Sequence, residues 1–221
     1  MPASVSPVSP RRLLWVEGKD DDAVVQSLCQ KNGVPHVFTV QEKGGIPRLL
    51  GGLPVELRAR TLEAFGLVVD ADEGARSRWA QIRGIAEDEG YTDLEEAPPN
   101  DGVIIPAQGD LPRFGVWIMP DNRSPGALED FAASLIPPGD RLWERAGEAV
   151  DTIPNNERLF ADVQRSKAHM HTWLAWQERP GSPMGQAIGK GDLDAHAPAA
   201  QRFVAWLRRL MVDEAEGDRA G

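Results

Sequence analysis

Three runs of apolar residues, each followed by acidic residues, set the pattern of the chain. They span residues 13–16, 65–69 and 114–119. A continuous apolar run of about four to eight residues is typical of a strand buried on both faces of a sheet. We expect two further strands at residues 36–40 and 103–105, where apolar residues are also grouped.

Helical patterns lie between these runs, at residues 19–29, at residues 75–89 and from Ala127 onward. In the second of them, Trp79, Ile82 and Ile85 fall on one side of a helix, as expected for a helix packed on a sheet. Strands that alternate with helices in this order predict an α/β fold with a mostly parallel sheet flanked by helices.

Beyond Pro138 the pattern is helical only, with helices expected at residues 141–150, 156–177 and 199–213. Pro198 suits the first position of the last helix. Residues 46–61 have helical propensity, but two prolines leave that region unassigned. We therefore predict three parts: a disordered Ser- and Pro-rich tail at residues 1–10, an α/β core at 11–137, and a helical C-terminal segment at 138–215 packed on the core.

The charge balance limits how the chain could hold nucleic acid. Its net charge of −10 and pI near 4.9 argue against a broad basic surface, because neutralisation of phosphates supplies most non-specific affinity. A polyanionic substrate would need metal ions or a local basic patch. The candidates for such a patch are Arg11, Arg12, Arg48, Arg58, Arg60, Arg76, Arg78 and Arg83.

Cysteine usage and hydropathy indicate the compartment. A single cysteine, Cys29, excludes an internal disulfide and a zinc site built from several cysteines. No apolar segment has the length of a signal peptide core or a membrane span. These features predict a cytoplasmic protein that does not contact membranes.

Acidic residues close each of the three main apolar runs: Glu17 the first, Asp70 and Asp72 the second, and Asp121 the third. Ligands of open parallel sheets bind beyond the carboxyl ends of the strands, so these side chains should meet at one edge. Clustered carboxylates raise one another's pKa and are commonly neutralised by a hard divalent cation such as Mg²⁺ or Mn²⁺. Asp121 has an equal alternative as a turn residue, since Asp and Asn both stabilise turns.

The acidic segments resemble a known family. Glu17-Gly18-Lys19-Asp20 and Asp70-Ala71-Asp72, each following a strand, are similar to the Toprim domain of topoisomerases, primases and nucleases of the overcoming-lysogenisation-defect type. Longer stretches at residues 15–21, 117–122, 126–131 and 167–176 resemble a bacterial Toprim-like family known as a domain of unknown function.

The resemblance implies Mg²⁺- or Mn²⁺-dependent phosphodiester hydrolysis or nucleotidyl transfer on nucleic acid. It assigns Glu17 as a general acid/base or ligand and Asp70 and Asp72 as metal ligands. It adds Glu129 or Asp130 to a second metal position and Lys167 as a catalytic residue that stabilises the charged transition state. Two metal ions together would activate water and stabilise the leaving oxygen.

Structural explanations compete with these roles. Glu129 and Asp130 suit an early helical turn, where acidic residues are favoured, and Lys167 suits an exposed helix position. The whole chain could also be a non-catalytic module that holds a metal or a nucleotide beside a separate ATPase partner. Residues 185–190 lack the first glycine and the Ser/Thr of a phosphate-binding loop, so we reject that motif.

Overall fold

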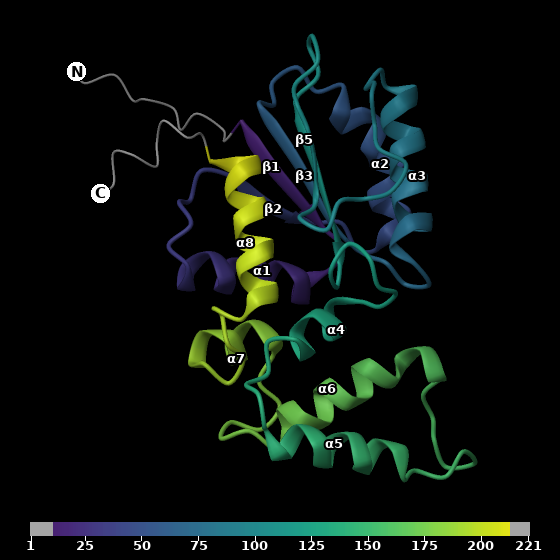
Figure 1. Cartoon of the computed structure of the whole chain (residues 1–221), viewed down its shortest axis with the longest axis vertical. Coiled ribbons are helices and arrows are strands. Elements are labelled where there is room, and N and C mark those ends of the chain that lie inside the picture. The colour runs from purple at the N-terminus through teal and green to yellow at the C-terminus, as the bar shows by residue number, and fades with distance from the viewer. Residues whose placement is uncertain (1–10, 213–221) are drawn as a thin grey trace, which may run out of the picture.

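The computed structural model describes residues 11–212 and contains one five-stranded sheet (Figure 1). The strands are β1 (Arg12–Val16), β2 (Thr39–Glu42), β3 (Ala64–Asp70), β4 (Val103–Ile105) and β5 (Arg113–Met119). Their order is β2-β1-β3-β5-β4, with β4 antiparallel to β5 and all other pairs parallel. The structure confirms the α/β fold class and the mostly parallel sheet.

The central strands match their apolar runs closely, whereas the edge strand β2 lies further along the chain than predicted. We expected it at residues 36–40, but it spans Thr39–Glu42 and pairs with β1 from Leu13↔Thr39 to Val16↔Glu42. The residues of β2 are exposed or only partly buried, because no strand covers its outer edge. The grouping of apolar residues therefore predicted the wrong bounds for this strand, because pairing with β1, and not burial, determines which residues form it.

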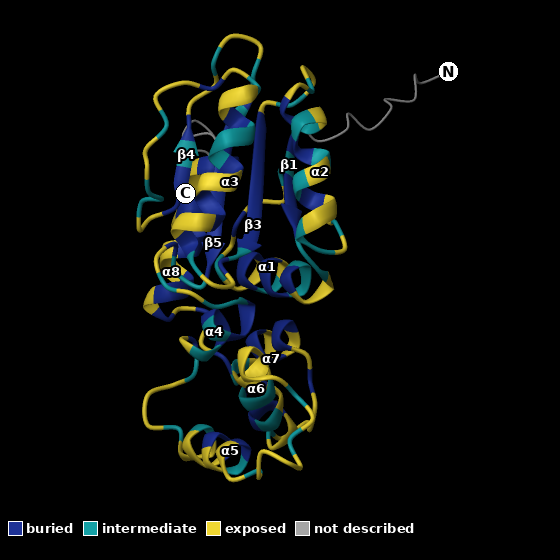
Figure 2. Ribbon diagram, turned by 90° about the vertical axis from the view of Figure 1, so that its right-hand side faces the viewer, coloured by how far each residue is buried: buried dark blue, intermediate teal, exposed yellow. Residues whose placement is uncertain are grey.

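Helices cover both faces of the sheet. One face packs against α1 (Lys19–Lys31) and α8 (Pro198–Met211), and the other against α2 (Ile46–Leu57) and α3 (Ala75–Asp88). Figure 2 shows β3 and β5, which lie between them, as almost wholly buried. The unassigned region is thus helical, with one proline in the first turn and Pro54 inside the helix.

The C-terminal helix α8 lies directly on β3 and β5. Leu210 of α8 approaches so closely that a Cβ at Gly115 would lie 2.5 Å from its Cδ2 atom. Only glycine fits there, so the packing of the last helix depends on a small residue in the middle of β5.

A helical arm follows α4 (Leu128–Ala133) and extends away from the sheet (Figure 1). It consists of α5 (Arg141–Asp151), the short 3-10 turn η1 (Asp162–Gln164), and α6 (Arg165–Ala175). We expected a helix from residue 156, but α6 begins at Arg165 because residues 152–161 form turns and loop. The helix α7 (Met184–Lys190) was not predicted; it packs tightly on α1.

No helix in residues 11–212 is both long and apolar enough to cross a membrane. The predicted tail at residues 1–10, and the last residues of the predicted 138–215 segment, lie outside the described residues.

Candidate metal centre

Glu17 joins the carboxyl ends of β1 and β3. Its Oε1 atom accepts a hydrogen bond of 2.8 Å from the backbone N–H of Asp70. Its own carbonyl accepts a bond of 2.9 Å from the N–H of Gly45, at the start of α2. Burial raises the pKa of Glu17 above its ordinary value, although the bond from Asp70 opposes this shift.

Asp70 is the most strongly perturbed acid at this edge. Its Oδ1 atom accepts a hydrogen bond of 3.0 Å from the N–H of Leu128, at the start of α4. Burial raises the pKa of Asp70 to about 8, and the negative charges of Asp21, Glu17, Glu129 and Asp72 add to the effect. The carboxylates are therefore close enough to repel one another, as expected from their positions at the carboxyl ends of the strands.

Asp21 also belongs to this cluster, although it was not among the ligands predicted from the sequence. It is only 7% exposed, and its Oδ2 atom accepts a hydrogen bond of 3.1 Å from the N–H of Gly18. Its Oδ1 atom is buried without a partner among the described residues. Burial, followed by the charge of Glu17, raises the pKa of Asp21 to about 7.

A sequence signal for Asp21 exists, because an acid at the third helical position commonly bonds back to the cap residue. Asp21 occupies that position in α1, so its side chain turns back toward the end of β1. The neighbouring run of acids concealed it, since acidic residues in a first helical turn need no further explanation.

Asp72 is held differently from Asp70. Its backbone lies in the left-handed region, with φ of 52°, and exchanges two hydrogen bonds of 2.9 Å with Gly126. Its carboxylate pairs with Arg78, whose Nε–H also donates to the carbonyl of Asp70 at 2.9 Å. Strand geometry therefore stops at Asp70 and does not continue through Ala71.

Glu129 and Lys167 face each other across the junction of α4 and α6. Lys167 Nζ lies 3.4 Å from Glu129 Oε1; the lysine side chain is 56% exposed and the glutamate only 10%. Two clefts, of about 460 and 510 Å³, meet here and share Asp70, Glu129 and Lys167 in their lining. Glu17 and Asp21 line one cleft, and Asp72 lines the other.

Asp130 has a structural task at the same junction. Its Oδ2 atom accepts a hydrogen bond of 2.9 Å from the N–H of Ala127, and its Oδ1 atom one of 2.6 Å from the hydroxyl of Ser166. The side chain caps α4 and ties it to α6. Both of its oxygens are already engaged, which favours Glu129 over Asp130 as a ligand.

Asp121 forms a turn at the end of β5. Its Oδ1 atom accepts hydrogen bonds from the N–H groups of Arg123 at 3.0 Å and Ser124 at 2.7 Å. Its Oδ2 atom accepts one of 3.0 Å from the Ser124 hydroxyl. Asp121 lines neither cleft. The geometry thus favours the turn role over the ligand role.

The candidate arginines do not gather at the clefts. None of the eight lines either cleft. Arg78 pairs with Asp72, Arg58 pairs with Glu89, and Arg60 lies 3.4 Å from Asp110. Within residues 11–212, no three His, Cys, Asp or Glu side chains are arranged as metal ligands as they stand. Instead, Arg78 pairs with Asp72 and Lys167 with Glu129, so these two cations neutralise part of the negative charge.

Fold and site together define an α/β protein with buried, mutually repelling carboxylates at the carboxyl ends of parallel strands. The chain belongs to the family described as "Protein of unknown function (DUF3226)", which matches residues 11–212. This finding agrees with the predicted likeness to a family of unknown function, whereas the individual signatures stay predictions.

No curated protein matches the chain. Among solved structures, the chain is similar to the C-terminal region of the Burkholderia pseudomallei OLD protein, with 14% sequence identity and a TM-score of 0.45. The alignment covers 92% of this chain and 99% of the other.

Proposed function

We propose that this protein is a Mg²⁺- or Mn²⁺-dependent enzyme that cleaves or transfers phosphodiesters of nucleic acid through a Toprim-type carboxylate site. The observation that carries the proposal is the crowding of Asp21 and Asp70, whose pKa values are raised to about 7 and about 8. Such crowding is unfavourable in a metal-free protein at neutral pH, and a divalent cation relieves it.

The donor set fits a hard cation. All the side chains involved offer oxygen, the preferred ligand of Mg²⁺ and Mn²⁺, and one buried oxygen of Asp21 has no partner among the described residues. Glu17, Asp70 and Asp72 would supply one position. Asp21 and Glu129 would supply a second, beside Asp70.

Bound divalent ions would supply a nucleophilic water and neutralise charge on the phosphate. The residues of this chain prepare the site for that chemistry. Glu17, whose pKa is raised by burial, is placed to act as the general acid/base. Lys167 lies at the mouth of both clefts, where its ammonium can pair with a phosphate oxygen instead of with Glu129.

One observation favours a second function, a non-catalytic module that binds a metal or nucleotide beside a separate ATPase partner. The pairing of Arg78 with Asp72 and of Lys167 with Glu129 already offsets part of the negative charge. Permanent pairing of this kind would leave the site able to hold a ligand without turnover.

The test combines metal binding with cleavage. Mg²⁺ and Mn²⁺ are titrated by calorimetry into the wild type, Asp70→Asn and Asp110→Asn, and each protein is incubated with end-labelled single- and double-stranded DNA and RNA. Asp70→Asn keeps the acceptor for the Leu128 N–H and removes only the charge. Asp110→Asn is the matched control, since Asp110 is an exposed acid outside both clefts.

We expect metal binding and cleavage in the wild type and control, and neither in Asp70→Asn. Metal binding without cleavage of any of the four substrates would support the non-catalytic module. Absence of metal binding in the wild type would refute the enzyme and the metal-binding form of the module.

A further inference from the structure

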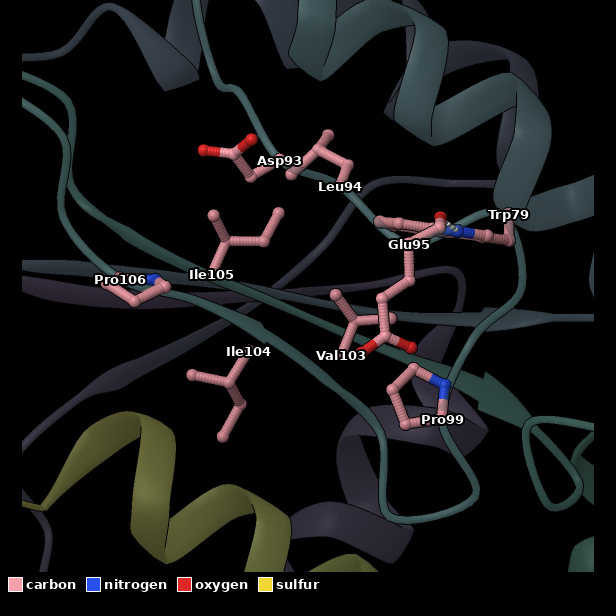
Figure 3. Close-up of a pocket in the computed structure, with 9 residues that line it drawn as sticks. All are labelled: Trp79, Asp93, Leu94, Glu95, Pro99, Val103, Ile104, Ile105 and Pro106. Carbon is pink, nitrogen blue, oxygen red and sulfur yellow. Dashed lines mark hydrogen bonds between the residues drawn. The ribbon is translucent and has the colours of Figure 1, made fainter.

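A small apolar pocket lies beside the edge strand β4, between that strand and the loop that follows α3 (Figure 3). Trp79, Val103 and Ile105 are buried and form its inner side, while Leu94 is half-buried. Its lining residues include none that line the two carboxylate clefts. The pocket is therefore a separate feature of the molecule.

Hydrogen bonds hold the wall of this pocket in place. The Tyr91 hydroxyl donates to the carbonyl of Pro112 at 2.7 Å, and Trp79 Nε1–H donates to the carbonyl of Glu95 at 2.8 Å. The N–H of Thr92 donates to Gln108 Oε1 at 3.0 Å. A pocket fixed in this way exists before anything binds, which lowers the entropic cost of binding.

The size of the pocket suits one side chain. Its volume is about 110 Å³. Sites for small molecules enclose roughly 300–1,000 Å³, whereas an apolar cavity of about 150 Å³ takes a single benzene molecule. An aliphatic side chain of a peptide matches this volume and its apolar inner side.

The surroundings of the pocket are acidic. Residues 91–112 contain five acidic residues and no Lys or Arg. Arginines from other elements contact this segment at Asp110, at the Asp101 carbonyl and at the Glu95 carbonyl, but none forms a salt bridge with the carboxylates of Asp93, Glu95 or Glu96 among the described residues. Asp93 and Glu95 line the pocket, and both are exposed, as is the adjacent Glu96. Figure 3 shows the Glu95 carboxylate beside Val103 and Pro99. Such a surface attracts positive charge and repels nucleic acid.

We propose that this pocket docks a basic peptide segment of a partner protein. One aliphatic side chain enters the pocket, and flanking Lys or Arg residues meet Asp93, Glu95 and Glu96. The peptide does not rely on adding a strand to β4, because the carbonyl of Val103 already accepts a bond of 2.9 Å from Trp206 Nε1–H. The inference stands independently of the metal site.

The experiment uses a library of random dodecapeptides displayed on phage, selected against the whole chain. We expect enrichment of peptides that carry several Lys or Arg residues around one Leu, Ile, Val or Met. Leu94→Trp fills the mouth of the pocket from its half-buried side and should weaken these peptides by roughly tenfold or more. Thermal unfolding of this variant checks that it is folded.

A second variant tests the charges without touching the apolar wall. Asp93→Asn/Glu95→Gln/Glu96→Gln should weaken the peptides several-fold at low salt and reduce the salt dependence of binding. Asn suits position 93, where φ is 58°. The matched control, Glu144→Gln/Glu148→Gln/Glu178→Gln, removes three exposed charges from the helical arm and the segment that follows α6, and should bind like the wild type.

The proposal is overturned if no peptide is enriched, if the enriched peptides lack basic residues, or if the pocket variants and the arm control bind them equally well.

Discussion

The ends of β3 and β5 lie side by side, with Asp70 as the last residue of β3 and Asp121 shortly after the end of β5. The pKa values of these two aspartates nevertheless shift in opposite directions. Burial and four neighbouring carboxylates raise the pKa of Asp70 to about 8. Partial burial also acts on Asp121, but hydrogen bonds from Ser124 and Arg123 outweigh it and lower its pKa. A position at the end of a strand is therefore not enough to indicate a metal ligand. A carboxylate whose negative charge the protein leaves uncompensated is the better candidate.

The dependence of stability on pH gives the largest expected difference between the two strand ends. The folded-state pKa values of Asp70 and Asp21 are raised from 3.8 to about 8 and about 7, so the fold prefers their protonated forms. Without divalent ions, their contribution is complete below pH 3.8 and is lost as the pH rises through about 7 and 8. The loss is on the order of a few kcal/mol.

Asp121 acts with the opposite sign. Because its folded pKa is lowered, its contribution is present above its ordinary pKa and is lost as the pH falls. Urea unfolding of the wild type and Asp70→Asn between pH 5 and 9 measures the first effect, and unfolding of the wild type and Asp121→Asn between about pH 2 and 5 measures the second. A wild-type slope in Asp70→Asn would contradict the assignment.

Stabilisation by Mg²⁺ should separate the same two residues. At a concentration of about 100 times its Kd, a ligand that binds only the folded state adds about 2.7 kcal/mol to the free energy of unfolding. We expect Asp70→Asn to lose this gain, because Asp70 lies beside both proposed metal positions, and Asp121→Asn to keep it. Thermal unfolding with and without Mg²⁺ measures the gain, and equal losses in both variants would place Asp121 in the site after all.

Removing the Asp121 side chain should cost stability without affecting the metal. Asp121→Ala leaves the N–H groups of Arg123 and Ser124 without their acceptor, at a cost of about 1–2 kcal/mol. Asp121→Asn should cost less, because its amide oxygen still accepts. Urea unfolding at pH 7 compares them, and an Ala variant as stable as the wild type would show that the turn does not need this residue.

The smallest expected effect on stability is that of Lys167→Met. Its pair with Glu129 is largely solvated on the lysine side, so the free energy of unfolding should fall by less than about 1 kcal/mol. Mg²⁺ affinity should rise, because a competing cation is gone, while cleavage falls. Calorimetry and the cleavage assay measure both quantities; a weaker Mg²⁺ affinity would argue that Lys167 orients Glu129 for binding.

The sequence predicts the buried strands of this fold well and the exposed elements poorly. β3 and β5 are continuous apolar runs because both of their faces are covered, so their pattern is unambiguous. The edge strand β2 and the helix α7 have no such pattern. Gly185 of α7 lies against the backbone of Ala23 in α1, where a Cβ would be 2.6 Å from the carbonyl oxygen. This close contact is invisible without the partner helix.

The residues of the site also divide into those that the sequence predicts and those that it does not. Strand ends bring Glu17 and Asp70 together, as the sequence predicted, because the parallel register fixes them. Asp21 was not predicted because its burial comes from the residues packed around the carboxyl ends of the strands, and the pattern of its own helix does not show this. Asp121 could not be separated from the others, since only the orientation of Ser124 and Arg123 shows that its charge is compensated.

The position of α8 on β3 and β5 has a consequence for how the protein is made. The strands it covers are synthesised long before it, and Leu210 cannot reach its place above Gly115 until most of the chain has left the ribosome. The part of this sheet face that α8 covers, beside α1, thus stays open until α8 is synthesised. Folding of this core is completed after synthesis of residues 198–211, and it is the nascent chain, rather than the finished protein, that is exposed to aggregation.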